Sequence, residues 1–242
     1  MNSISDVDET RRQFLLYLLS TGSLASIPGC SSTVQSTPGI PKELPPGRSI
    51  FELDGDVRVN NKPATLQTLI RLGDVVETGE DSYVIFVVNK DAFILRSSGT
   101  MSFPEPVPSP TVTPTAFNLD KGKALSVLAS RKTRIVTPNA VVGIRGTGVY
   151  LETQPDLSYV CTCYGVADLA PADNPGITET IEATHHDEQR YILTDPNIQN
   201  RIQPAPFVNH DDQELLLIET LAGRTPPCSV PKTVTRTRPQ YR

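Results

Sequence analysis

The sequence predicts a mainly β protein, a sandwich or roll of short strands with a small C-terminal segment containing one helix. A β-solenoid is the alternative fold. Three observations lead to this prediction. Short apolar runs recur between turn signals rich in Gly, Asn, Asp and Pro. The 22 prolines among 242 residues disfavour long helices, because proline breaks a helix interior. One segment, 211–222, has the apolar spacing of an amphipathic helix.

Length and composition set the outer limits. A chain of 242 residues suggests one domain with an added subdomain, and 38% hydrophobic residues without any Trp can fill a modest core. The formal net charge is −5, and the body of the chain carries no basic stripe. Binding to nucleic acid is therefore not expected, since it requires a basic surface.

Residues 1–29 have the features of an export signal. Arg11 and Arg12 precede Phe14 and Leu15, and an apolar run to Gly29 follows that is too short and interrupted for a membrane span. The arrangement resembles a twin-arginine (Tat) signal. Ile27-Pro28-Gly29-Cys30 resembles a lipobox, which implies that Cys30 is lipidated and begins the mature chain. Residues 30–47, rich in Ser, Thr and Pro, are expected to form a solvated tether.

The resemblance to a lipoprotein signal also implies a location. The residue after the lipidated cysteine is Ser31 and not Asp, which in lipoproteins of this type indicates release from the inner membrane. The expected location is the bacterial cell envelope, on the periplasmic side, with a lipid anchor in the membrane and the outer membrane favoured.

The β-domain is expected to span residues 48–170. Ser82–Val88 is the most strand-like run and is expected to be buried on both faces. Residues 104–114 carry five prolines and predict an extended insert, because each proline removes a hydrogen-bond donor. The other expected strands or apolar runs are Ser49–Leu53, Val57–Val59, Leu66–Leu72, Ala92–Arg96 and Ala124–Leu128.

The stretch 133–165 carries the most specific pattern. Its strand-like runs, such as Ala140–Ile144, Val149–Thr153 and Leu157–Cys163, are interrupted at Gly143, Gly146 and Gly148. A phosphate cradle would need a helix after the glycines, whereas a strand pattern follows, so no nucleotide is expected. The glycines instead predict a bend at a sheet corner, with Arg145 paired to a carboxylate or a carbonyl.

The run Thr-Pro-Asn-Ala-Val-Val-Gly-Ile-Arg-Gly-Thr-Gly at 137–148 resembles the signature of the FecR domain, an extracytoplasmic β-rich module. Gly55-Asp56-Val57, the run 72–79 and Lys121–Ala124 fit the same family, so the resemblance covers about 48–170. FecR itself relays a signal to a cytoplasmic sigma factor through a membrane span. No second apolar span follows the signal here, so sigma regulation is not carried over from FecR, and the resemblance is taken to imply a protein-binding module. The family-motif residues are Thr137, Pro138, Gly143, Ile144, Arg145, Gly146 and Thr147.

Residues 171–230 are expected to form a C-terminal subdomain. Strands are predicted at Ile177–Ala183 and Tyr191–Leu193, and a helix at 211–222. Asp211 is placed to cap this helix with Glu214 three residues later, the spacing of a capping box. Residues 231–242 hold one Lys and three Arg with no acid, and are expected to be a disordered basic tail.

A candidate metal centre combines Cys161 and Cys163 with the three histidines of the chain, His185, His186 and His210. The C-x-C spacing places both thiols on one face of a strand, and thiolates with imidazoles suit Zn or Cu. Adjacent histidines in a strand point to opposite faces, so one is expected to bind metal and the other to support it. Two alternatives remain open: plain packing of the cysteines, or a disulfide to Cys228 in an oxidising compartment.

These features predict a non-enzymatic envelope lipoprotein whose FecR-like domain binds a protein partner or senses a signal, with a metal that stabilises it or is sensed by it. No nucleophile, base and orienting group are found together, so an enzyme is not expected. The alternative function is a periplasmic redox or electron-transfer metalloprotein.

Overall fold

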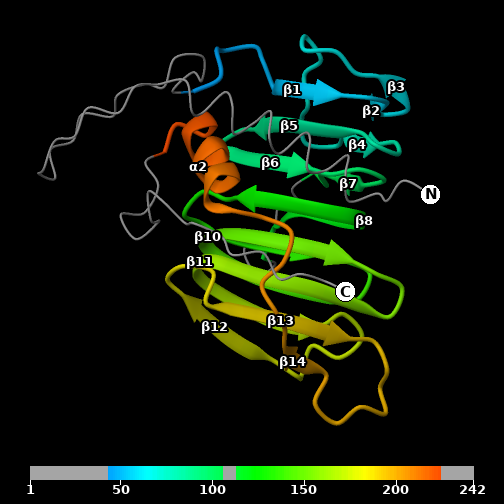
Figure 1. Cartoon of the computed structure of the whole chain (residues 1–242), viewed down its shortest axis with the longest axis vertical. Helices are drawn as coiled ribbons and strands as arrows, with labels where there is room; N and C mark the ends of the chain where they lie inside the picture. The colour runs from blue at the N-terminus through cyan, green and yellow to red at the C-terminus, as the bar shows by residue number, and fades with distance from the viewer. Residues whose placement is uncertain (1–42, 106–112, 225–242) are drawn as a thin grey trace, which may run out of the picture.

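The computed structural model describes residues 43–105 and 113–224, and it confirms a mainly β fold with one helix near the C-terminal end of the described chain (Figure 1). The predicted signal 1–29, Cys30, the tether up to residue 42, most of the proline-rich insert, Cys228 and the tail 231–242 lie outside the described residues. The elements are β1 (Ile50–Asp54), β2 (Val57–Val59), β3 (Lys62–Pro63), β4 (Val75–Thr78), β5 (Tyr83–Val88), β6 (Asp91–Leu95), β7 (Thr100–Ser102), β8 (Thr115–Val127), β9 (Lys132–Val136), β10 (Ala140–Thr153), β11 (Leu157–Pro171), β12 (Glu179–Ala183), β13 (Glu188–Leu193), β14 (Ile202–Pro204) and α2 (Asp212–Leu221).

Three long strands divide the sheet into two layers, because each changes partner along its length. Residues 141–145 of β10 pair with β9, whereas 148–153 pair with β8. Likewise, β11 pairs with β13 through 157–162 and with β12 through 165–169. The helix layer contains β1, β5, β6, β13, β14 and the adjoining halves of β8, β10 and β11; the back layer contains β2, β3, β4, β7, β9, β12 and the other halves.

A glycine with positive φ lies at the bend of each long strand: Gly122 in β8 at +90°, Gly146 in β10 at +65° and Gly165 in β11 at +90°. Glycine alone adopts such angles without steric cost, so these positions let a strand turn from one layer into the other. The sequence analysis expected two runs, Ala140–Ile144 and Val149–Thr153. They form the single strand β10, because the bulge at Gly146 and Thr147 keeps the ladder continuous.

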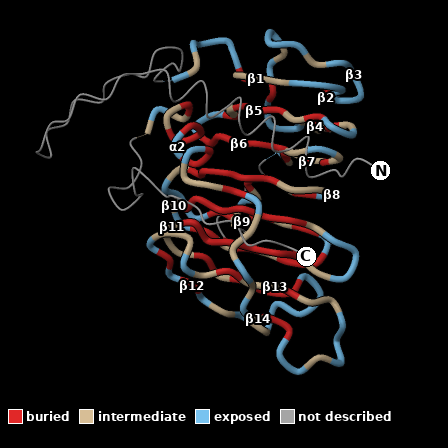
Figure 2. Tube along the Cα trace, in the orientation of Figure 1, coloured by how far each residue is buried: buried red, intermediate tan, exposed pale blue. Residues whose placement is uncertain are grey.

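Two apolar clusters follow from the alternation of side chains along the strands. One lies between the layers, where Phe86, Phe93, Phe103 and Phe117 contact one another with neighbouring rings 5.1–6.4 Å apart. The other lies on the outer face of the helix layer, beneath α2. Figure 2 shows the buried residues running along the central strands and the exposed ones in the connections. Both faces of β5 are largely buried, as the sequence predicted.

Helix α2 matches its prediction closely. Asp211 caps it by accepting from the amides of Gln213 and Glu214, and the Glu214 side chain completes the capping box. Leu215, Ile218 and Leu221 are fully buried against the helix layer. No helix within 43–105 and 113–224 is both long and apolar enough to cross a membrane.

The C-terminal strands belong to the same sheet as the expected β-domain. Strands β12 and β13 both pair with β11, which runs across the expected boundary at residue 170, and β14 extends the same sheet. Strand β14 lies between the strand predicted at Tyr191–Leu193 and the predicted helix, where the sequence analysis named no strand. Conversely, Leu66–Leu72, expected as an apolar run before a turn, is itself a loop between β3 and β4.

Replacement of Gly165 by Ala tests the bend. An added Cβ would lie 2.9 Å from the carbonyl oxygen of Gly146, and the backbone would keep φ at +90°. We expect Gly165→Ala to lower the free energy of unfolding by about 1–3 kcal/mol. The control is Gly143→Ala, also in a long strand, where the nearest atom lies 3.5 Å away and φ is ordinary. Equal denaturant midpoints for the two variants would contradict this account.

Candidate metal centre

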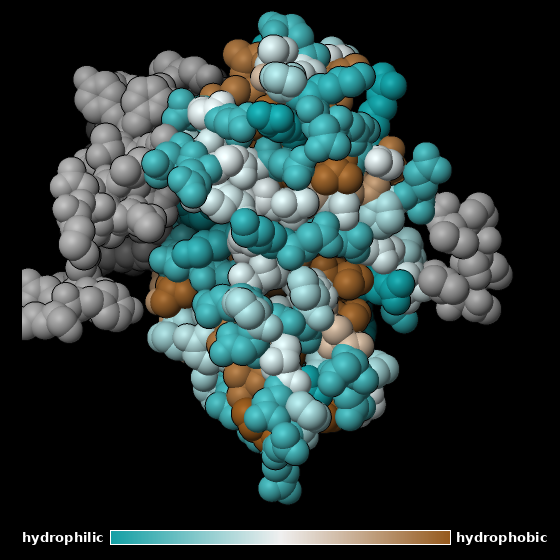
Figure 3. Space-filling view, turned by 90° about the vertical axis from the view of Figure 1, so that its right-hand side faces the viewer, coloured by the Kyte–Doolittle hydropathy of each residue, from teal (hydrophilic) through white to brown (hydrophobic). Residues whose placement is uncertain are grey.

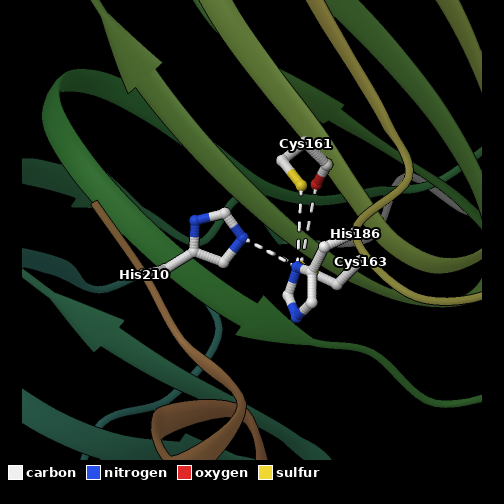
Figure 4. A group of neighbouring side chains, drawn as sticks. All are labelled: Cys161, Cys163, His186 and His210. Atoms are coloured by element: carbon white, nitrogen blue, oxygen red, sulfur yellow. Dashed lines mark hydrogen bonds between the residues drawn. The ribbon is translucent and has the colours of Figure 1, made fainter. Parts of the chain in front are cut away.

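Four of the five predicted ligands converge at one point under α2. Cys161 and Cys163 come from β11, His186 from the turn between β12 and β13, and His210 from the residue before the helix cap. One ligand atom from each lies within 4.8 Å of every other. Figure 4 shows the side chains of these residues gathered from three segments of the chain.

Strand alternation places the two thiols. Val160 faces the core between the layers, whereas Cys161 and Cys163 belong to the cluster under α2. The turn that carries His186 is closed by Asp187, whose carboxylate accepts from the amide and hydroxyl of Thr184. The His186 amide donates to the carbonyl of Cys163 at 2.9 Å, which ties the turn to β11.

His210 is positioned by buried polar groups. Arg96 Nη2 donates to the carbonyl of Asn209 at 2.9 Å and to both carboxylate oxygens of Glu214 at 2.8 and 2.9 Å. The side-chain amide of Asn209 donates to the carboxylate of Glu152 at 2.6 Å. The His210 ring stacks on Tyr150 with centroids 4.4 Å apart. These contacts fix the backbone and the ring of this ligand from two sides.

The hydrogen bonds of the two rings define which nitrogen carries the proton. His210 Nδ1 lies 2.7 Å from the carbonyl of Val208, which only accepts, so Nδ1 carries the proton. His186 Nε2 lies 3.1 Å from the Asp212 carboxylate and donates to it. In the neutral rings, His210 Nε2 and His186 Nδ1 therefore present lone pairs to each other across 3.0 Å. Such an arrangement requires a shared cation, either a proton or a metal.

Three distances between ligand atoms are close to those around a tetrahedral ion. Cys161 Sγ lies 3.7 Å from His186 Nδ1, and Cys163 Sγ lies 3.6 Å from His210 Nε2. A tetrahedron with Zn–S and Zn–N bonds of about 2.3 and 2.0–2.1 Å needs about 3.5 Å between sulfur and nitrogen and about 3.3 Å between nitrogens. The distances observed agree to within about 0.3 Å of these values.

Electrostatics within the group lower the pKa of one thiol and raise the pKa of the other. Burial alone would raise the pKa of Cys161, but hydrogen bonds with Cys163, His186 and His210 outweigh it and lower that pKa. Burial and the neighbouring Cys161 raise the pKa of Cys163. Burial opposes the charge of His186, yet its bonds to Asp212 and Cys161 raise its pKa to about 9. Below that pH, a metal must displace a proton from His186.

The centre is closed to solvent. The relative exposures of Cys161, Cys163 and His210 are 0%, 1% and 0%. Structural zinc sites have four protein ligands and no open position, whereas catalytic sites keep one position for water or substrate. The geometry is therefore that of a site that joins segments together.

His185 lies apart from the four-ligand group. Its Nε2 lies 2.8 Å from Asp212 Oδ1, the same oxygen that accepts from His186. The sequence analysis expected one of the adjacent histidines to support the other, and the structure gives that supporting position to His185. Burial would raise the pKa of Asp212, but the two histidines lower it, so this carboxylate is ionised.

Sequence reasoning missed Asp212. The sequence did contain a signal for this role. Asp212 is an acidic residue that comes two positions after the candidate ligand His210 and directly after the helix cap. Cys161 and Cys163 are free thiols among the described residues and do not pair with each other. Cys228 lies outside those residues, so a disulfide to it stays an alternative beside metal binding and plain packing of the thiols.

The family-motif residues form the bend of β10 and its flanks. Thr137 caps the turn before β10 through the amide of Ala140 at 2.9 Å, with Pro138 in that turn. Gly143 and Ile144 lie in the paired part of β10 before the bend at Gly146, where Thr147 bonds to the Val166 carbonyl. Arg145 pairs with Asp168 at 3.1 Å, the carboxylate partner that the sequence analysis expected.

No protein-family model matches this chain, and no curated protein matches it. Among solved structures, it is similar to two crystal structures of a candidate anti-sigma factor from Parabacteroides distasonis ATCC 8503, at 1.65 and 2.50 Å resolution. The TM-scores are 0.43 and 0.42, with 13% sequence identity over 54% of this chain. The match spans 58% of the length of that protein. A similarity of this size assigns no function.

Two neighbouring aspartates provide a matched test of the centre. Asp212→Asn removes the charge that orients and polarises His186, and should weaken metal binding about 10–100-fold. Asp211→Asn is the control, because asparagine caps a helix as well as aspartate does. Competition with a chromophoric chelator measures both affinities. Equal affinities would show that Asp212 does not act on the metal.

Proposed function

We propose that this chain is a non-enzymatic lipoprotein of the bacterial cell envelope, in which a FecR-like β-domain binds a partner protein and one zinc ion stabilises the domain. The observation that carries the zinc is the convergence of two thiols and two imidazole lone pairs, with each ring oriented by a second hydrogen bond. In known zinc sites, such outer hydrogen bonds fix the tautomer of the ligating histidine.

Charge balance favours a divalent ion. Two thiolates and two neutral imidazoles neutralise Zn²⁺, whereas Cu⁺ would leave one net negative charge at a site that is almost fully buried. An unpaired buried charge is strongly unfavourable. Electron transfer by copper at the same ligands is the competing function, because soft ligands also suit that metal.

Burial also supports a non-enzymatic role. The thiols and His210 are the groups of this centre with the chemistry of a nucleophile and a base. They are buried, and Tyr150 and Phe207 pack on the His210 ring. A substrate could reach them only if this packing opened. The site therefore fits a role in which it holds β11, the 184–187 turn and the start of α2 together.

The FecR-like assignment rests on the motif at 137–148 and its three companion runs. Such a motif would give a β-domain two features: glycines at the strand bend and an arginine paired with a carboxylate on the neighbouring strand. The export and anchoring proposals rest on Arg11, Arg12, Phe14, Leu15 and Cys30, and they place the domain and its partner on the periplasmic side of a membrane.

Elemental analysis of the metal content tests whether the protein binds zinc. The purified protein should contain one zinc per chain, and a chelator should lower its melting temperature. At a hundredfold excess over Kd, bound metal adds about 2.7 kcal/mol to the free energy of unfolding. Affinity should fall as pH falls, about tenfold per unit for each proton displaced. Copper with a visible absorption band would support the electron-transfer alternative instead.

The adjacent histidines supply the matched variants for that measurement. His186→Ala should lose the metal and the chelator response, because it removes a ligand. His185→Ala should keep the metal, because it removes only a hydrogen bond to Asp212. Cys161→Ser/Cys163→Ser should behave as His186→Ala does. A wild-type protein without metal, equally stable with and without chelator, would leave packing as the role of the thiols.

Anchoring is tested at Cys30. Cys30→Ser should leave an uncleaved precursor or release a soluble form, because only the thiol accepts the lipid. Ser32→Ala is the control and should stay in the membrane fraction. Separately, replacing Arg11-Arg12 by Lys-Lys should block export. A Cys30→Ser protein with the mature mass in the membrane fraction would exclude the lipobox interpretation.

A further inference from the structure

Exposed apolar side chains are concentrated in one loop. Four large hydrophobic residues are exposed among those described, and three of them, Leu66, Leu69 and Leu72, lie between β3 and β4. Their relative exposures are 41%, 37% and 37%. We call residues 64–73 the leucine loop. Soluble proteins rarely gather such residues on the surface without a binding role.

The leucine loop is held in a defined shape. The Ser49 hydroxyl accepts from the Ile70 amide at 3.0 Å and donates to the Ile70 carbonyl at 3.3 Å. The Thr68 hydroxyl accepts from the Thr65 amide at 2.9 Å. Ile70 itself is buried. Because Ser49 and the bond within the loop fix its shape, its leucines face solvent without having to be ordered by a ligand.

Cations flank the leucines. Lys62 and Arg71 are exposed on either side of Leu66 and Leu69, and exposed Arg48 adjoins the anchoring residue Ser49. The Asp74 carboxylate accepts from the Asn60 side chain and from the backbone amide of Arg71, both at 2.7 Å. These bonds point the carboxylate toward the loop backbone. Glu105, beside Gly73, is the acidic group at the far end. Apolar side chains bordered by cations match the interface of an anionic phospholipid surface.

The leucine loop lies close to the point where the chain from Cys30 enters the domain. The first described residue, Glu43, bridges Ala222, and Ser49, six residues or at most about 20 Å further on, bonds to Ile70 of the loop. The thirteen residues 30–42 can span at most about 45 Å. This step rests on the proposed lipid anchor, which would keep this end of the domain near a membrane. Apolar residues interrupt the hydrophilic surface at the upper end of Figure 3, the end where Figure 1 places β1 to β3.

We propose that the leucine loop inserts into the phospholipid surface on which the chain is anchored. Leu66, Leu69 and Leu72 enter the boundary between headgroups and acyl chains, and Lys62 and Arg71 contact the phosphates. The lipid on Cys30 and the loop then act as two points of attachment. Two points define the orientation of the domain, whereas a lipid on a flexible tether leaves it free to rotate.

The absence of Trp from the chain allows a direct test. Leu69→Trp places the only indole of the protein in the loop, and Leu216→Trp places it at a similarly exposed position on α2 as the control. Each mature protein is reconstituted into vesicles that contain lipids brominated on their acyl chains. We expect the Leu69→Trp emission to shift to the blue and to be quenched, and the Leu216→Trp emission to remain unchanged. Arg71→Glu in the Leu69→Trp background should reduce quenching more on anionic than on zwitterionic vesicles.

Several results would overturn the inference. The first is an anchored protein in which Leu69→Trp emission is not quenched. The second is equal quenching of both variants. The third is a blue shift without lipid, caused instead by added protein or by a high concentration of the chain itself. Lipidation is measured separately by the mass added to Cys30. A chain without this lipid whose Leu69→Trp emission is quenched refutes the anchor and supports the loop; a lipidated chain without quenching does the reverse.

Discussion

The structure depends on one constraint: both faces of the helix layer are apolar, and each must be covered. The back layer covers one face, and α2 covers the other, where Ile85, Ile94 and Leu125 lie beneath it. Burial of apolar surface is the largest favourable contribution to folding, so the position of α2 follows from it. Once α2 is in place, Asp212 in its first turn and His210 just before its cap lie beside the two cysteines of β11. The candidate metal centre thus follows from how the sheet is covered.

Polar groups beneath α2 determine how accurately the centre is built. Arg96 bonds to Glu214 within the helix and to Asn209 before it, while Glu152 holds the Asn209 side chain. These charged groups lie in a low-dielectric setting, where unmet partners are costly. They give the His210 backbone one arrangement, whereas apolar packing alone would tolerate several. The centre therefore combines apolar burial, which brings the segments together, with hydrogen bonds that orient them.

The sequence predicted the fold class, the helix with its cap and the ligand group, because each has a local signal. A continuous apolar run identifies β5, the Asp211 and Glu214 spacing identifies the cap, and strand geometry places Cys161 and Cys163 on one face. The division into two layers had no local signal, since it depends on which strand meets each half of β8, β10 and β11. For the same reason, the role of Asp212 could not be derived: it depends on where α2 lies relative to the 184–187 turn. The choice between His185 and His186 depends on the turn closed by Asp187.

The bridge between Glu43 and Ala222 brings the first described residue against the end of α2. The described chain thus starts and finishes at one corner, beside the edge strand β1. A short peptide could join these two points, and a new break could be opened in an exposed turn such as the one between β13 and β14. The sheet order would be unchanged, because it depends on tertiary contacts and not on where the polypeptide is cut. The same closeness makes the corner suitable for inserting this domain into a loop of another protein with little distortion of its host.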